Sequence, residues 1–288
     1  MKKHLIIDGN NLVHRAYWIS NNREAANHIF IVLRSLKSYV EQFKPDKIWC
    51  AWDMRLSSEP ALRKQIDTEY KQTRDVDYNK QVHEQTDLIA EFFKILGVCN
   101  IYPTRGEADD IIFWLTSELD GKKTVISADT DFFQLIKEDV DVYSPIKKVI
   151  YNREAFKENF GFMPENYPLY KSITGDKADN ILGLDKFGPK KALQIIEKSI
   201  KLSEEQQAII NSNLQLINLD NRGDSRWDEE YKTYAGQIEV RSEANFQTFL
   251  EMCEQQRFIS IINQQTLWHK AFFIKNIMNS LIAELFSK

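Results

Sequence analysis

Three short β-prone segments in the first half of the chain each run into acidic side chains. His4–Ile7 is followed by Asp8, Lys47–Trp52 by Asp53, and Lys122–Ser127 by Asp129 and Asp131. Segments with helical periodicity, such as 24–43 and 81–96, lie between these strands. Strands that alternate with helices form a mainly parallel sheet, and the carboxyl ends of parallel strands meet at one edge. We therefore predict an α/β fold with a row of carboxylates along that edge.

The segment Gly106–Leu119, GEADDIIFWLTSEL, places three more carboxylates directly before an apolar run. Glu107, Asp109 and Asp110 would lie in the first turn of a buried helix, where the helix dipole favours their charged form. A solvated acidic helix start is the simpler interpretation of this segment alone. Many carboxylates cannot share a pocket as bare anions, however, and Mg²⁺ prefers oxygen ligands. Together with the strand-end acids they predict two divalent ions about 4 Å apart, an arrangement that cleaves phosphodiester bonds.

The composition is that of an ordinary soluble globular protein. Its 288 residues are 43% hydrophobic and 28% charged, with a formal net charge of −4, so any DNA binding would depend on local basic patches. The three cysteines lie far apart, which fits reduced thiols in a cytosol and argues against a zinc site or a disulfide frame. No apolar run is long enough to span a membrane and no signal peptide is expected, so we predict a cytoplasmic location without a membrane partner.

Two further stretches have unusual patterns. Residues 54–80 carry mixed charges without periodicity, and a loop of this length in a compact domain suggests a functional flap or mobile helix. In the helical second half, Asp176 and Asp179 are three residues apart, which predicts that they share one helical face. Gly183–Lys191 is typical of a hairpin that leads into a helix, whose free N–H groups would suit a DNA phosphate.

Five motifs occur in an order and spacing that resemble a known family. They are DGNNLVHRAYW, YKQTRD, GEADDI, SADTDF and TGDKADNILGLDKFGPKKA. Over residues 3–200 the chain resembles the bacteriophage and bacterial 5′-nuclease (flap endonuclease) family, which includes the 5′-nuclease domain of bacterial DNA polymerase I. The resemblance implies a PIN-like, mostly parallel sheet flanked by helices, with a helical arch and a helix–three-turn–helix.

The resemblance also implies which acids bind the two metal ions. The ion nearer the nucleophile would be held by Asp8, Asp53 and Glu107, with Asp109 between the two ions. The second ion would be held by Asp129, Asp131 and Asp176, while Asp110 and Asp179 would act through waters. The expected ions are Mg²⁺, with Mn²⁺ able to substitute. For any single acid, an ordinary surface charge remains the alternative.

The implied DNA contacts lie in the arch and the hairpin. In the arch, Lys71 and Arg74 match a basic pair that contacts the scissile phosphate and so counts as catalytic, and Tyr70 would stack on a base. For the two cations, solvated loop charge is the alternative. The helix–three-turn–helix, about residues 171–200, would place Gly188, Lys190 and Lys191 on duplex phosphates and a K⁺ ion on hairpin carbonyls. Pro189 replaces a residue that is commonly small, which the start of a helix tolerates.

We accordingly expect a nuclease core over residues 1–160, with its arch at about 54–80, and a helical region over 161–288. The expected activity is 5′–3′ exonuclease and flap endonuclease cleavage, in which a metal-bound hydroxide attacks phosphorus and leaves a 5′-phosphate and a 3′-hydroxyl. Its substrates would be flapped, nicked or 5′-ended DNA and RNA–DNA primer hybrids in replication, with replication proteins as further partners. We expect a freestanding monomer in the bacterial cytoplasm, encoded by a phage rather than a bacterium.

Three rivals compete with this interpretation. A PIN-type ribonuclease shares the acid-tipped sheet but generally lacks the arch and the hairpin. A phosphatase with a nucleophilic aspartate needs a second acid two residues later, and Asp8-Gly9-Asn10 lacks it. A non-catalytic scaffold that binds DNA junctions would be expected to have lost some of the acids, and all are present.

Overall fold

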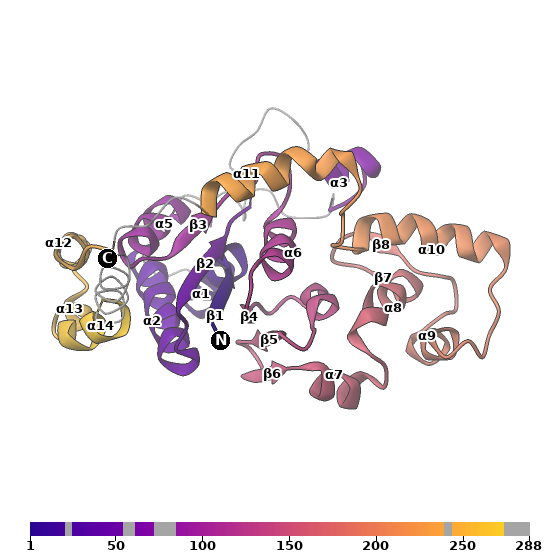
Figure 1. Cartoon of the computed structure of the whole chain (residues 1–288), viewed down its shortest axis with the longest axis horizontal. Helices are drawn as coiled ribbons and strands as arrows, with labels where there is room; N and C mark the ends of the chain where they lie inside the picture. Colours follow the sequence, from indigo (N-terminus) through magenta and orange to yellow (C-terminus); the bar gives the residue numbers. More distant parts are fainter. Residues whose placement is uncertain (21–24, 54–60, 72–84, 239–243, 274–288) are drawn as a thin grey trace, which may run out of the picture.

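The computed structural model describes residues 1–20, 25–53, 61–71, 85–238 and 244–273. Its centre is a six-stranded sheet in the order β3-β2-β1-β4-β5-β6 (Figure 1). The strands are β1 Lys3–Asp8, β2 Lys47–Ala51, β3 Cys99–Ile101, β4 Lys122–Ile126, β5 Val140–Ser144 and β6 Val149–Tyr151. All neighbouring pairs are parallel except β5 and β6. The prediction of a mainly parallel α/β sheet is confirmed.

The strand register brings the acidic strand ends together. Asp8 pairs with Ala51 of β2, and Ile7 pairs with Ile126 of β4. Asp53 therefore follows its strand only two residues beyond the level of Asp8, and residue 127 lies beside Asp8. The acids after the three central strands consequently share one edge of the sheet.

Each face of the sheet is covered by its own helices, because alternate side chains of a strand point to opposite faces. Leu5 and Ile7 belong to one hydrophobic cluster and Ile6 to the other. The first cluster includes residues of α1 Gly9–Ser20, α2 Ala25–Phe43, α5 Thr86–Ile95, α12 Phe246–Gln255, α13 Ile259–Ile262 and α14 Gln265–Phe272. The second includes residues of α6 Ala108–Glu118, η1 Asp131–Leu135, α7 Arg153–Phe160 and α11 Asp228–Ile238.

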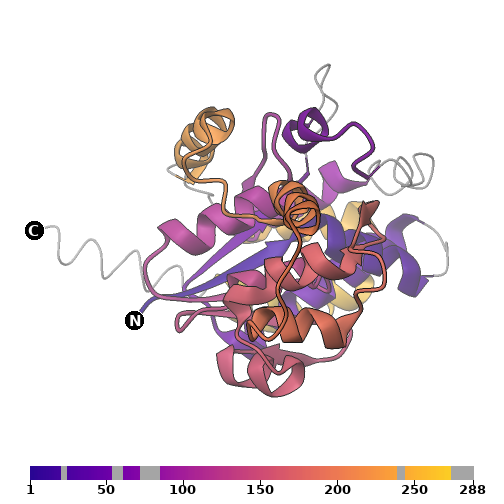
Figure 2. The ribbon, with the colours of Figure 1, turned by 90° about the vertical axis from the view of Figure 1, so that its right-hand side faces the viewer.

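A helical lobe follows the sheet. It contains η2 Pro164–Asn166, α8 Tyr167–Thr174, the short strands β7 Gly175–Asp176 and β8 Ile181–Leu182, α9 Pro189–Ile196 and α10 Glu204–Ile217. A third hydrophobic cluster, which includes Ile173, Ala192 and Ile210, holds its helices together. Figure 2 shows this lobe in front of the sheet. The lobe connects through η3 Ser225–Trp227 to α11, which returns to the sheet, and the short helix α3 Leu62–Ile66 lies near α10.

The expectation that Asp176 and Asp179 share a helical face is wrong. Helix α8 ends at Thr174 because Gly175 adopts a left-handed φ of 80°, and the chain then forms the antiparallel pair β7–β8. A Cβ atom on Gly175 would lie 2.5 Å from the backbone nitrogen of Gly183, so the two glycines permit this close crossing. Asp179 instead lies in the turn between the two strands.

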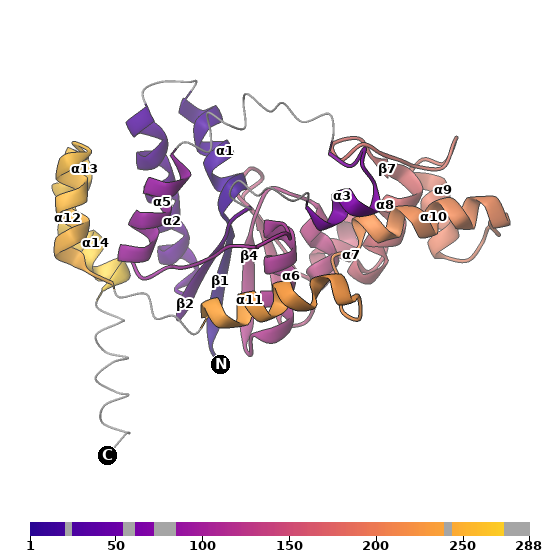
Figure 3. The same ribbon diagram turned by 90° about the horizontal axis from the view of Figure 1, so that it is seen from above.

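The C-terminal helices pack away from the helical lobe. Helices α12–α14 lie against α2 and α5, at the opposite end of the molecule from α9 and α10 (Figures 1 and 3). The division of the chain at residue 160 stays a prediction. Within the part of the chain that the structure describes, every helix is too short or too polar to span a membrane.

Candidate metal centre

Asp8 is fixed at the end of β1 by two hydrogen bonds. Its carboxylate accepts one from the backbone nitrogen of Asn11 at 3.0 Å and one from the hydroxyl of Ser127 at 2.8 Å. Burial raises the pKa of Asp8 to about 7, with the Asp129 and Asp53 carboxylates contributing in the same direction. The raised pKa indicates that no nearby positive charge offsets this buried carboxylate. A bound cation would supply that charge.

The first residues of α1, directly after Asp8, connect the ends of three strands. The Asn10 side-chain oxygen accepts a hydrogen bond from the backbone nitrogen of Asp53 at 3.0 Å, and the Asn11 side-chain oxygen accepts one from Ala128 at 3.1 Å. Gly9 is required there, because a Cβ atom would lie 2.5 Å from the Trp52 ring. The sequence analysis quoted these residues only within the motif DGNNLVHRAYW and missed that the two amides position the neighbouring loops.

Asp53 links the sheet edge to the start of α6. Its carboxylate accepts a hydrogen bond from the backbone nitrogen of Ala108 at 3.0 Å, directly beside Glu107, the N-cap residue. Burial raises the pKa of Asp109 well above its usual range, and Asp129, Glu107 and Asp8 add to this, although Lys71 opposes it. Asp8, Asp53, Glu107 and Asp109 thus converge on one buried, electronegative site.

Asp110 is oriented differently from the other acids of α6. Its carboxylate accepts hydrogen bonds from Arg63 at 2.7 and 3.0 Å, from Asn221 at 3.1 Å and from the backbone nitrogen of Glu107 at 2.9 Å. These bonds engage both carboxylate oxygens. Arg63 also donates to Glu107 at 2.9 Å and is only 1% exposed. Sequence reasoning missed Arg63, which looked like one more charge in the mixed segment 54–80.

Tyr70 and Lys71 lie over the acids. Lys71 donates to Glu107 at 2.9 Å and lies 4.0 Å from Asp109. The Tyr70 hydroxyl donates to Glu107 and Asp179, both at 3.3 Å, and its ring is 4% exposed. Arg74 lies outside the described residues. Contact of any of these three with DNA stays a prediction.

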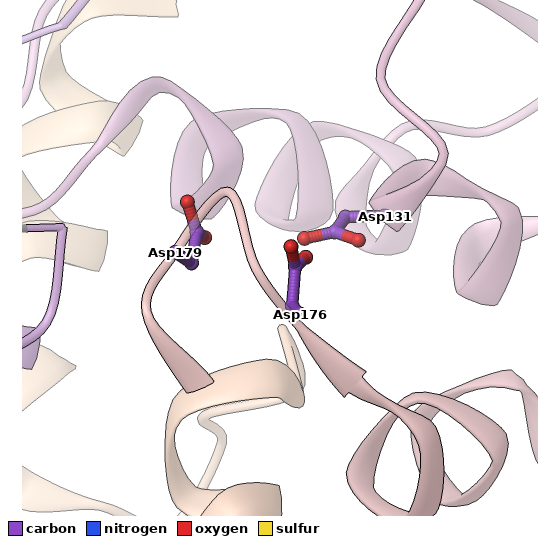
Figure 4. A group of neighbouring side chains, drawn as sticks. All are labelled: Asp131, Asp176 and Asp179. Atoms are coloured by element: carbon purple, nitrogen blue, oxygen red, sulfur yellow. The ribbon is translucent and has the colours of Figure 1, made fainter. Parts of the chain in front are cut away.

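A second acidic group lies where β7 meets η1. Asp131, Asp176 and Asp179 each offer an oxygen within 4.8 Å of the others (Figure 4). Asp129 is placed beside them, because one of its carboxylate oxygens accepts a hydrogen bond from the Asp131 backbone nitrogen at 2.9 Å. Lys171 of α8 forms ion pairs with both Asp131 and Asp176. Sequence reasoning missed this lysine.

The two acids paired with Lys171 differ in their electrostatics. Burial, with the charge of Asp129, raises the pKa of Asp131 to about 6. For Asp176, hydrogen bonding and charge attraction from Lys171 outweigh burial and lower the pKa. The ammonium of Lys171 therefore compensates only part of the negative charge. Both acidic groups offer hard oxygen donors with charge left to neutralise, which fits divalent cations such as Mg²⁺ or Mn²⁺.

The predicted hairpin leads into a helix whose N-terminus is exposed to solvent. Helix α9 begins at Pro189, and Gly188, Lys190 and Lys191 are all exposed. A Cβ atom on Gly188 would meet nothing within 4 Å, so this glycine leaves room for an approaching molecule rather than relieving an internal clash. Free N–H groups beside two lysines can bind a phosphate.

Comparisons with known proteins show the family and the fold. Residues 3–161 match the family described as 5′-3′ exonuclease, N-terminal resolvase-like domain. A 5′-3′ exonuclease of Aquifex aeolicus is 30% identical over 206 residues, which are 69% of this chain and 70% of the relative. Flap endonuclease Xni of Psychromonas ingrahamii is 27% identical over 222 residues, 74% of this chain and 83% of the relative. The T5 D15 protein, co-crystallised with metal ions, shares the fold with a TM-score of 0.65 at 19% identity, over 82% of this chain and 99% of that one. The chain belongs to the 5′-3′ exonuclease family.

Proposed function

We propose that this protein is a structure-specific 5′ nuclease that uses two Mg²⁺ ions to cleave phosphodiester bonds of flapped, nicked or 5′-ended DNA. The observation that carries the proposal is the convergence of eight acids from separate segments at one edge of the sheet. They are Asp8, Asp53, Glu107, Asp109, Asp129, Asp131, Asp176 and Asp179. Clustered carboxylates remain ionised together near neutral pH only when nearby cations offset their repulsion.

Asp8, Asp53 and Glu107 would hold one ion and Asp129, Asp131 and Asp176 the other. Asp109 would lie between the two ions, and Asp179 would act through a water. When bound, such ions supply a hydroxide near neutral pH and stabilise the leaving oxygen. Asp110 would act on the ions only indirectly, because both of its oxygens accept hydrogen bonds from Arg63, Asn221 and the backbone at the start of α6. Lys71, whose ammonium donates to Glu107, would bind the scissile phosphate together with Arg74, and Tyr70 would stack on a base.

The hairpin supports binding of duplex DNA that is independent of the DNA sequence. The N-terminus of α9, with Gly188, Lys190 and Lys191, would bind backbone phosphates, and hairpin carbonyls would bind a K⁺ ion. In the cell, the proposed role is removal of flaps or RNA primers beside replication proteins, by a monomer in the cytoplasm of a bacterium or a phage-infected host. Mn²⁺ would substitute for Mg²⁺.

Cleavage of an end-labelled 5′-flap duplex in Mg²⁺ tests the proposal, beside the same duplex without a branch or 5′ end. We expect release of the flap near the junction, lost in Asp129→Asn and when Ca²⁺ replaces Mg²⁺. Tight binding without cutting under any metal would favour the non-catalytic scaffold. Cleavage of single-stranded RNA alone would favour a PIN-type ribonuclease.

A further inference from the structure

Helix α11 holds the loop between β3 and α6, residues 102–106. Two of its side chains, Glu230 and Gln237, are seven residues apart and therefore lie on one face of the helix. Gln237 bonds both backbone groups of Tyr102, at 2.8 and 2.7 Å. Glu230 bonds the backbone of the loop nearer to α6. Figure 1 shows α11 extending from β3 toward α3.

The Glu230 carboxylate is engaged on both of its oxygens. It accepts hydrogen bonds from the backbone nitrogens of Thr104 at 2.9 Å and Arg105 at 2.6 Å, and the residue is only 3% exposed. Among the residues that the structure describes, no lysine or arginine forms an ion pair with it. A buried carboxylate is costly unless it is strongly hydrogen-bonded, and hydrogen bonds to a charged acceptor are among the strong ones. The two bonds therefore fix this part of the loop.

The same part of the loop has little room to move. The backbone nitrogen of Leu62, the first residue of α3, donates to the Arg105 carbonyl at 2.9 Å. A Cβ atom on Gly106 would lie 2.6 Å from the Tyr234 hydroxyl oxygen. The end of the loop is thus enclosed between α3 and α11.

Glu107 is the next residue along the chain and the N-cap of α6. Thr104 and Arg105 lie three and two residues before it, so a shift of their backbone moves Glu107 as well. A functional side chain must be held within about 0.5 Å of its place. Removing a group that orients a metal ligand typically lowers metal affinity by about 10–100-fold.

We propose that Glu230 is a positioning residue for the first of the two ion sites. By fixing the backbone of the loop, it places the Glu107 carboxylate where, with Asp8 and Asp53, that carboxylate holds the ion. Glu230 acts through Glu107 and touches neither the ion nor DNA. This inference rests on the proposed nuclease function, because that function assigns Glu107 to an ion.

Titration calorimetry with Mn²⁺ alone tests the inference in two backgrounds. Asp176→Asn weakens the second ion site and leaves the first to be measured, and Asp8→Asn does the reverse. Glu230→Gln keeps the shape of the side chain but turns an amide group toward a backbone N–H, so one of the two hydrogen bonds is lost. Glu229→Gln changes the neighbouring, exposed acid of α11 and is the matched control.

We expect Glu230→Gln to weaken Mn²⁺ binding about tenfold in the Asp176→Asn background and to change it less than about twofold in the Asp8→Asn background. The control should change neither. Equal weakening in both backgrounds would assign Glu230 a general structural role and overturn the inference. Unchanged binding in both would overturn it too.

A second pair of variants reaches the same loop without changing Glu230. The added methyl group of Gly106→Ala would meet the Tyr234 hydroxyl, so Mn²⁺ binding at the first site should weaken and should recover in Gly106→Ala/Tyr234→Phe. This pair replaces Glu230→Gln if that variant does not fold. Unchanged binding in Gly106→Ala would then contradict the inference.

Cleavage of the 5′ flap gives a separate readout. In Glu230→Gln the Mg²⁺ concentration that gives half the maximal rate should rise about tenfold, while the rate at saturating Mg²⁺ stays within about threefold of the unmodified protein. Failure of the unmodified protein to cut the flap would contradict the proposed function. The Mn²⁺ titrations would still test whether Glu230 positions Glu107.

Discussion

The guanidinium of Arg63 and the carboxylate of Asp110 form a two-point ion pair, with both side chains 1% exposed. Burial alone would lower the pKa of Arg63, but Asp110, Tyr70, Glu107 and Asp109 together raise it well above its usual value. Because α3 carries Arg63 and α6 carries Asp110, the pair fastens the segment that leads to Lys71 onto the start of the acidic helix. Arg63 also donates to Glu107 at 2.9 Å and so helps to position that carboxylate.

Removing Arg63 should destabilise the protein strongly. Arg63→Met leaves Asp110 buried without its cation, and breaking a buried pair costs about 3–5 kcal/mol. Urea unfolding measures the change in the free energy of unfolding. The double variant Arg63→Met/Asp110→Leu should recover much of the loss, because no charge is then left unpaired. Equal stability of the single and double variants would contradict this account.

Stability without metal should depend on the charge of Asp8. Its folded pKa of about 7 lies above the ordinary value of 3.8, so the folded state binds the extra proton and the free energy of unfolding falls as pH rises from about 4 to 7. A difference of about three pKa units is worth up to about 4 kcal/mol. His4 and His28 act in the opposite direction, because burial lowers the pKa of each.

The Asp8→Asn variant isolates this contribution. In EDTA it should unfold at a higher urea concentration than the unmodified protein at about pH 8, and at a similar one at about pH 4. Divalent ions should stabilise the unmodified protein more than the variant. An identical pH dependence of the two proteins would show that Asp8 does not titrate in this range.

Lys71 should act on turnover more than on binding. Its ammonium donates to Glu107 at 2.9 Å and lies 4.0 Å from Asp109, beside the proposed ion site, and fixed cations contribute most in the transition state. Lys71→Ala should therefore lower the single-turnover cleavage rate by about 10²–10³-fold and leave the Kd in Ca²⁺ within about threefold. Lys64→Ala, an exposed lysine of α3, is the matched control. A loss confined to Kd would assign Lys71 to ground-state binding.

The strand-end acids were predictable because the position of an acid after a β-prone segment is a local property. Parallel pairing then places Asp8, Asp53 and Asp129 on one edge, as the register confirms. The shape of the 175–182 segment was not predictable from acid spacing, since it depends on the contact between Gly175 and Gly183, which lie eight residues apart.

Helix α11 illustrates what sequence patterns leave out. Its first turn lies in a stretch, 220–230, that is polar enough to predict a connection. Glu230 is nevertheless buried, because its carboxylate accepts hydrogen bonds from the backbone nitrogens of Thr104 at 2.9 Å and Arg105 at 2.6 Å. Gln237 similarly bonds both backbone groups of Tyr102. These polar side chains form hydrogen bonds with backbone groups far away in the sequence. From the sequence alone they cannot be told apart from solvent-exposed polar residues.

Lys171 should compete with the second metal ion. Its ammonium pairs with Asp131 and Asp176, two of the three acids whose oxygens lie within 4.8 Å of one another. Lys171→Met removes that cation and keeps most of the side-chain volume. The variant should bind Mn²⁺ more tightly at this site, because the ion no longer displaces an ammonium. Titration calorimetry with the metal alone measures this.

Without metal, Lys171→Met should lose about 3 kcal/mol in its free energy of unfolding, and Mn²⁺ should restore most of it. Lys123→Met is the control: it removes another buried lysine, whose ion-pair partner Asp139 is 46% exposed and lies away from the acids. Its loss should be the same with and without Mn²⁺. Weaker Mn²⁺ binding in Lys171→Met would mean that the lysine helps to hold the acids in place for the ion rather than standing where the ion binds.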